Sequence, residues 1–130
     1  MRLTDRKDSL SINKVEYKEN KKMKLGTLTV ALGDLSFDDA CKFLSENGVQ
    51  MVEIGCGGFP GKAHCDAAEL LADEEKRKAF MDTLNKYGLE ISALSSHGNM
   101  VHPDKAIAKS FDDDLTNGHS AGWKSWGYRW

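Results

Sequence analysis

The chain has 130 residues, with 18 lysines and arginines against 20 aspartates and glutamates, for a formal net charge of −2. This length allows one domain with a modest core, and the balanced charge gives no general attraction to nucleic acid or to anionic membranes. No apolar run reaches the ~18 residues of a membrane span, and the first residues lack the apolar region of a secretory signal. We therefore expect a cytoplasmic protein without nucleic-acid or membrane partners.

The charges are unevenly distributed along the chain. Residues 1–22 carry seven basic and four acidic side chains, residues 23–115 carry nine and sixteen, and residues 116–130 carry two and none. The acidic body is a poor match for a DNA backbone. Cysteines at 41, 56 and 65 are widely spaced and odd in number, which predicts reduced thiols. A zinc site of Cys56, His64 and Cys65 is an alternative, but it lacks a fourth ligand and a close cysteine pair.

Residues 1–22 are polar and have no hydrophobic period, so they are expected to form a disordered leader. A second hypothesis concerns the gene. Lys18-Glu19 can be encoded by AAGGAG, a bacterial ribosome-binding sequence, and Asn20, Lys21 and Lys22 would be the spacer before a start codon at Met23. The domain is therefore expected to begin at Met23 and to run to residue 115.

A strand is predicted over residues 24–32, KLGTLTVAL, because aliphatic and β-branched residues dominate it. Ser36 then caps a helix, with Asp39 in the capping-box position. Asn47-Gly48 ends this helix, since glycine suits the left-handed position after a helix. Residues 49–54, VQMVEI, form the second predicted strand.

A glycine-rich segment, GCGGFPG at residues 55–61, follows the second strand. It matches neither GxGxxG nor the P-loop pattern, so a phosphate loop is not supported. Gly55 is interpreted as a position where the backbone can approach a ligand closely. Glu53, at the end of the strand, either faces a binding site or occupies a solvated edge.

The third unit begins with a helix capped by Asp73 and ended by Gly88, followed by a strand over residues 89–94. The loop SSHGNMVHPD then brings His97, Asn99 and His102 close together, and Pro103-Asp104 begins a helix over residues 105–115. Active sites of βα units gather at the carboxyl ends of the strands. These three side chains could meet over a polyhydroxylated ligand, and the alternative is a surface loop with two incidental histidines.

Strands and helices alternate as β-α-β-α-β-α, and the second and third units align at Gly48 and Gly88. This order predicts an α/β fold with a parallel sheet. Residues 116–130 lose the pattern, and all three tryptophans of the chain fall among them. Reading the codons of residues 123–130 in a shifted frame can yield another helix end, glycine and strand start. Residues 116–130 are therefore interpreted as an aberrant, out-of-frame tail on a truncated product.

Residues 23–115 resemble the N-terminal part of the sugar phosphate isomerase/epimerase family, the xylose isomerase-like TIM barrels that include endonuclease IV. The resemblance lies in KLGTLTVAL, in the strand end VEIG at residues 52–55 and above all in SSHGNMVHPD. It covers three of eight βα units, so it implies an incomplete (β/α)8 barrel.

By this resemblance, His97, Asn99, His102, Glu53 and Gly55 would bind a small sugar, sugar phosphate or inositol derivative. The parent would move a proton beside a carbonyl with a divalent cation (Mn, Mg, Co or Zn) held by later strands, which are absent here. The fragment is then expected to bind no metal, to lack catalysis and to associate with itself. The alternatives are a small non-enzymatic α/β binding module and a fragment of an endonuclease IV-like phosphodiesterase.

Overall fold

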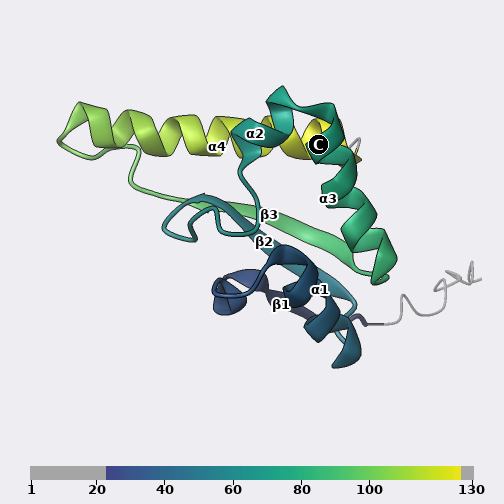
Figure 1. Ribbon diagram of the computed structural model, residues 1–130. Coiled ribbons are helices and arrows are strands. Elements are labelled where there is room, and N and C mark those ends of the chain that lie inside the picture. Colours follow the sequence, from purple (N-terminus) through teal and green to yellow (C-terminus); the bar gives the residue numbers. More distant parts are fainter. Residues whose placement is uncertain (1–22, 127–130) are drawn as a thin grey trace, which may run out of the picture.

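The computed structural model describes residues 23–126, which form a three-stranded parallel sheet, four α-helices and one 3-10 helix (Figure 1). The strand order is β1-β2-β3, so sequence neighbours are also neighbours in the sheet. This confirms the predicted α/β class with parallel strands. The elements are β1 (Gly26–Leu28), η1 (Thr29–Leu32), α1 (Phe37–Glu46), β2 (Met51–Gly58), α2 (Ala67–Ala72), α3 (Glu74–Lys86), β3 (Glu90–His97) and α4 (Lys105–Trp126). The predicted leader, residues 1–22, lies outside the described residues.

The predicted helix signals are confirmed. Ser36 Oγ accepts the Asp39 backbone N–H at 3.1 Å, which caps α1, and donates its own proton to the Asp39 carboxylate at 2.7 Å. The Asp73 carboxylate accepts two backbone N–H groups at the start of α3. Gly48 and Gly88, which follow α1 and α3, have φ of 79° and 65°, the left-handed conformation expected of glycine after a helix.

The core lies on one face of the sheet. Alternate residues of β2, Val52, Ile54 and Cys56, are at most 1% exposed. They pack in one cluster with residues from all four helices: Cys41 and Leu44 of α1, Ala67 and Leu70 of α2, Phe80 and Leu84 of α3, and Ala121 of α4. The helices therefore cover the same face of the sheet.

The opposite face of the sheet is largely open in the described part of the chain. Leu28, Glu53 and Ala93 pair across the three strands, so their side chains share a face. Leu28 and Ala93 are exposed, and Glu53 is half-buried. An apolar and an acidic side chain thus face solvent from the middle of a parallel sheet, where coverage on both faces is usual.

Three predicted strand ends were wrong, and one short helix was not predicted. The first strand ends at Leu28 and continues as the 3-10 helix η1 instead of reaching Leu32. The second strand continues to Gly58, so the first half of the glycine-rich segment is buried strand and not loop. The third strand extends to His97. The helix α2 was not predicted. Its N-cap is Asp66, whose side chain accepts the backbone N–H groups of Ala68 and Glu69.

The end of the chain differs most from expectation. The predicted helix begins at Lys105, and the Asp104 carboxylate accepts the Ala106 N–H at 2.8 Å, but the helix continues past residue 115 to Trp126. Gly118 and Ala121 are buried against the core. The predicted end of the helix at residue 115 is therefore wrong, because residues 116–126 continue it and pack on the core; residues 127–130 lie outside the described part. The displaced reading frame is a hypothesis about the gene and stays a prediction.

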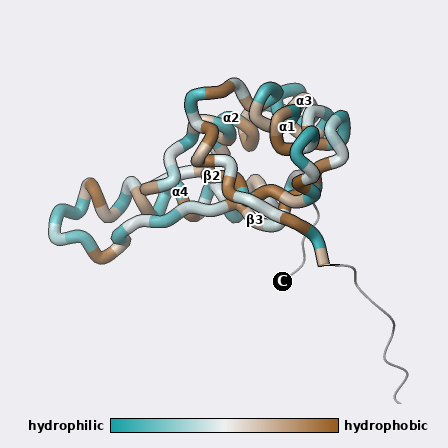
Figure 2. The backbone as a smooth tube through the Cα atoms, turned by 90° about the horizontal axis from the view of Figure 1, so that it is seen from below, coloured by the Kyte–Doolittle hydropathy of each residue, from teal (hydrophilic) through white to brown (hydrophobic). Residues whose placement is uncertain are grey.

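Small residues explain this difference. Asp114, Gly118 and Ala121 are three or four residues apart, so they lie on one face of α4. None of the three has a large apolar side chain to reveal that face, and the small size of Gly118 and Ala121 lets the helix approach β2 closely. The first turns of α4 extend beyond the ends of the strands, as Figure 2 also shows.

None of the helices in residues 23–126 combines the length and the apolar character of a membrane span.

Candidate functional site

The carboxyl ends of β2 and β3 are joined at Gly58 and His97. These two residues pair across the strands, and the Phe59 backbone N–H donates to the His97 carbonyl oxygen at 2.7 Å. A Cβ on Gly58 would overlap that carbonyl group, and Gly58 has φ of 64°. Glycine is therefore required here on two grounds, and it brings the β2 end against the start of the histidine loop, residues 97–104.

The histidine loop is held by its own side chains. The Asn99 side-chain oxygen accepts the Val101 N–H at 3.1 Å, and the Asn99 carbonyl oxygen accepts the His102 N–H at 3.1 Å. His102 Nδ1 in turn accepts the Asp104 N–H at 3.0 Å. The loop thus uses the acceptor atoms of Asn99 and His102 to order its own backbone.

This arrangement decides what the loop offers a ligand. Because Nδ1 of His102 accepts a hydrogen bond, the neutral ring carries its proton on Nε2. The amide nitrogen of Asn99 likewise keeps its two protons. The loop therefore presents N–H donors to groups rich in acceptor oxygens, such as hydroxyl, carbonyl or phosphate. Within the described residues the exposed His97 ring has no hydrogen-bond partner and is available to the same ligand.

Glu53 and Gly55 occupy a different part of the sheet. Glu53 pairs with Ala93, four residues before His97, which is a distance of ~13 Å along the strand. Gly55 is buried, and a Cβ there would lie 2.8 Å from Cβ of Pro60, which folds back over it. The structure thus brings His97, Asn99 and His102 together in one loop, while Glu53 is set apart and Gly55 lies beneath the turn that follows β2.

Residues 23–126 show no side-chain cluster for a divalent metal. Within residues 23–126 no group of three His, Cys, Asp or Glu side chains comes close enough to hold an ion. His64 belongs to the alternative zinc site with Cys56 and Cys65. Its Nε2 lies 3.1 Å from the Leu35 carbonyl oxygen and its ring packs against Phe37, which indicates a structural role.

The three cysteines are buried free thiols. Burial raises the pKa of Cys65 to about 12 and, together with the charge of Asp38 or Asp114, raises the pKa values of Cys41 and Cys56 to about 11. A nucleophilic cysteine needs a lowered pKa and access to solvent. These thiols have neither, so they act as small apolar core residues.

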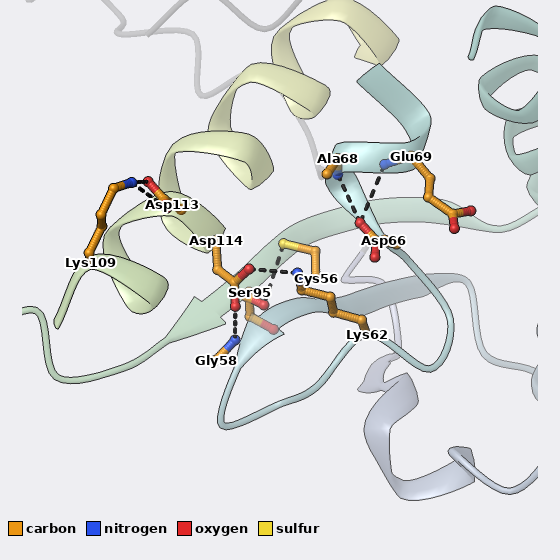
Figure 3. Close-up of polar contacts among 10 residues, drawn as sticks. All are labelled: Cys56, Gly58, Lys62, Asp66, Ala68, Glu69, Ser95, Lys109, Asp113 and Asp114. Atoms are coloured by element: carbon orange, nitrogen blue, oxygen red, sulfur yellow. Dashed lines mark hydrogen bonds and ion pairs between the residues drawn. The ribbon is translucent and has the colours of Figure 1, made fainter. Parts of the chain in front are cut away.

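One polar contact at the end of β2 was not predicted. Asp114 of α4 reaches the glycine-rich segment, where its carboxylate lies 2.6 Å from Lys62 Nζ and accepts the Gly58 N–H at 2.9 Å (Figure 3). The available signal was a lysine, Lys62, directly after a segment that contains four glycines, together with the acidic run at residues 112–114 of α4. Neither pattern indicates on its own that the two segments meet.

A concave region of about 500 Å³ lies beside α2 and α3. Stacked rings of Phe37 and Phe80, 4.7 Å between centroids, form part of its wall with His64 and the ion pair of Lys76 and Glu69. None of the predicted site residues lines it. Its lining includes Lys62, which also contacts Asp114 at the end of β2.

No protein-family model matches the chain. A curated protein, uncharacterized protein YfiH of Bacillus subtilis (strain 168), is 36% identical over 91 residues. The alignment covers 70% of this chain but 29% of YfiH, so the chain spans less than a third of that relative. That relative is described as uncharacterized, so the similarity assigns no activity to the chain.

Proposed function

We propose that the chain is the N-terminal part of a xylose isomerase-like (β/α)8 barrel whose parent is a sugar or sugar phosphate isomerase or epimerase. In this proposal the chain supplies part of the sugar site and is catalytically incomplete. The observation that carries the sugar site is the bonding of the histidine loop, which engages the Asn99 side-chain oxygen and His102 Nδ1 and leaves N–H donors on both side chains.

The strand order and the helix coverage of the sheet support a barrel rather than a doubly wound fold. In doubly wound folds the strand order reverses and helices cover both faces, whereas in a barrel the strands follow in sequence and the helices lie outside. Here the order is β1-β2-β3, and residues of all four helices join one core cluster with Val52, Ile54 and Cys56. The face with Leu28, Glu53 and Ala93 then corresponds to a barrel interior.

The donors of the loop suit a sugar carbonyl. N–H groups directed at a carbonyl oxygen stabilise the negative charge that develops when a proton leaves the neighbouring carbon. The proton itself needs a base within hydrogen-bond reach. Glu53 is the carboxylate on the open face, but it is ~13 Å along the strand from His97, so the base and any metal ligands must come from outside these residues.

The same observations fit a cytoplasmic location, since Cys41, Cys56 and Cys65 are free thiols in the core, as is usual in a reducing compartment. They also fit a small-molecule partner, because the strand ends carry donors and not a basic surface. A sugar or sugar phosphate remains the partner proposed.

The test is a titration of the chain with D-fructose and with fructose 6-phosphate, followed by amide chemical shifts. We expect saturable shifts concentrated at residues 97–104. His102→Phe, which removes the donor, should weaken the response at least tenfold, and His97→Ala should weaken it less. His119→Gln on α4 is the matched control and should leave it unchanged. Equal small effects of all three substitutions would refute the site.

A small binding module is the second candidate, favoured by the burial of Ala121 of α4 in the core. A truncated barrel would not need its last helix to complete a core. Thermal unfolding by circular dichroism separates the candidates, because a sharp cooperative transition of a monomer indicates a self-sufficient module. Sequencing the gene beyond codon 115 is the second discriminating experiment. An open shifted frame long enough to complete the ~250 residues of a barrel supports the isomerase, and prompt stops in every frame support the module.

A further inference from the structure

The contact of Asp114 with the β2 end has the geometry of a bound anion. The carboxylate of Asp114 receives two N–H donors, the Gly58 backbone at 2.9 Å and Lys62 Nζ at 2.6 Å. A Cβ on Gly57 would lie 2.6 to 2.9 Å from three atoms of Asp114, so only glycine leaves room for this carboxylate. Figure 3 shows the carboxylate between the two donors.

The charges agree with this arrangement. Burial disfavours the charged form of Asp114, but the hydrogen bonds from Lys62 and from the Gly58 backbone and the charge of Lys62 outweigh it and lower the pKa of the carboxyl. The hydrogen bond to Asp114 in turn raises the pKa of Lys62. The side chain of Asp114 is 15% exposed and that of Lys62 is 39% exposed, so the site is shielded but reachable from solvent.

The neighbouring aspartate shows that this contact is specific. Asp113 points away from the sheet, is exposed and pairs with Lys109 one turn earlier on the same helix. Such i,i+4 pairs on an exposed helix face contribute little to stability. Asp114 instead meets a glycine backbone and a lysine from a segment more than fifty residues away, at the carboxyl end of β2, where parallel sheets bind their ligands.

We propose that Gly57, Gly58 and Lys62 form an anion-binding site that Asp114 occupies as an internal ligand, and that the external ligand is a phosphate monoester. Glycine N–H groups combined with a lysine are a common way to bind phosphate. An external phosphate must displace the Asp114 carboxylate, so the wild-type chain binds it weakly. Gly58 is paired with His97, which places this anion site next to the histidine loop.

The position of the anion site next to the histidine loop also suggests which ligand the proposed sugar site takes. This second part of the inference rests on the proposed function. A phosphate bound at Gly58 and a sugar bound by Asn99 and His102 belong to one ligand, a sugar phosphate. The anion site itself stands or falls independently, because inorganic phosphate tests it without any sugar.

The experiment compares Asp114→Ala with the matched variant Asp113→Ala and with the wild type. Inorganic phosphate is titrated at constant ionic strength, with the Gly58 amide shift and 31P relaxation as readouts. We expect Asp114→Ala to bind phosphate saturably and at least tenfold more tightly than the other two proteins. Adding Lys62→Met to Asp114→Ala should abolish the binding. If Asp114→Ala does not fold, Asp114→Asn preserves the size of the side chain and removes its charge.

An equal response of the Asp113 and Asp114 variants, or binding that survives Lys62→Met, would overturn the anion site. A second titration of Asp114→Ala uses glucose 6-phosphate and glucose. Tighter binding of glucose 6-phosphate than of inorganic phosphate supports a shared sugar phosphate site. Equal binding of the two phosphates would overturn that link while the anion site stands, so the two failures can be told apart.

Discussion

Gly118 of α4 packs directly on Cys56 of β2: a Cβ on Gly118 would lie 2.8 Å from the Cys56 sulfur. Cys56 is itself 1% exposed, and its thiol donates to the Ser95 carbonyl oxygen at 3.5 Å. The contact joins a helix residue from the segment expected to be aberrant to the central strand of the sheet. The second half of α4 is therefore part of the packed domain.

Gly118→Ala should destabilise the domain. Replacing a helical glycine with alanine normally gains ~1 kcal/mol, but an extra methyl group in a closely packed core costs about 1–3 kcal/mol. The Cys56 sulfur is at the end of a short side chain in a buried strand and has little room to move. We expect a net loss of about 1 kcal/mol in the free energy of unfolding, measured by urea denaturation.

A double-mutant cycle isolates the contact. Cys56→Ala removes the sulfur, so Gly118→Ala in that background should recover its helix-propensity gain and become stabilising. The coupling between the two sites is expected to be about 1–2 kcal/mol. Additive effects would show that α4 does not approach β2 as closely as described.

Acid should weaken the attachment of α4. The pKa of Asp114 is lowered in the folded state, so the stabilisation it provides is complete above the pKa of the unfolded chain, ~3.9, and is lost as the pH falls through the lower folded value. We expect the free energy of unfolding to fall below pH ~4 in the wild type. In Asp114→Asn the fall should be smaller. The same acid dependence in both proteins would contradict the ion pair with Lys62.

The sequence was informative wherever one residue determines a local structure. Ser36, Asp73 and Asp104 cap their helices because a short acceptor side chain at a helix start reaches the unpaired backbone N–H groups of the first turn. Gly48 and Gly88 end helices because glycine tolerates positive φ. Strand lengths were less predictable. Gly55 and Gly57 were read as loop residues, but tertiary packing by Pro60 and Asp114 uses their missing side chains inside a strand.

The candidate site was predictable only in part. His97, Asn99 and His102 are neighbours in sequence, so any fold would place them close together. The hydrogen bonds that occupy the Asn99 side-chain oxygen and His102 Nδ1 depend on loop geometry that the residue pattern does not contain. Asp114 and Lys62 meet only because α4 returns across the end of β2, and Gly118 and Ala121 allow that return without an apolar signature.

Alkaline pH should also destabilise the domain. The pKa values of Cys41, Cys56 and Cys65 are raised to about 11, 11 and 12, against ~8.5 in the unfolded chain. A raised pKa means that stability is complete below the unfolded value and is lost as the pH rises toward the folded value. At pH 10 the ionisation of each thiol in the unfolded chain should lower the free energy of unfolding by about 1–2 kcal/mol. Urea denaturation from pH 7 to 10 measures this loss, and Cys65→Ala should flatten the pH dependence. An unchanged slope would mean that Cys65 is not buried as described.

The open face of the sheet should cause self-association. Leu28 and Ala93 are exposed on that face, and β1 and β3 each have an edge that pairs with no other strand in residues 23–126. Unpaired strand edges beside apolar surface recruit other chains, so we expect the 130-residue chain to associate at micromolar concentrations. Ala93→Lys places a charge on the open face at the β3 edge and should shift the chain toward monomer in analytical ultracentrifugation. Ala68→Lys makes the same change at an exposed position of α2 and should not. If both variants and the wild type are monomeric, the open face is not an adhesive surface, and the small-module interpretation gains over a truncated barrel.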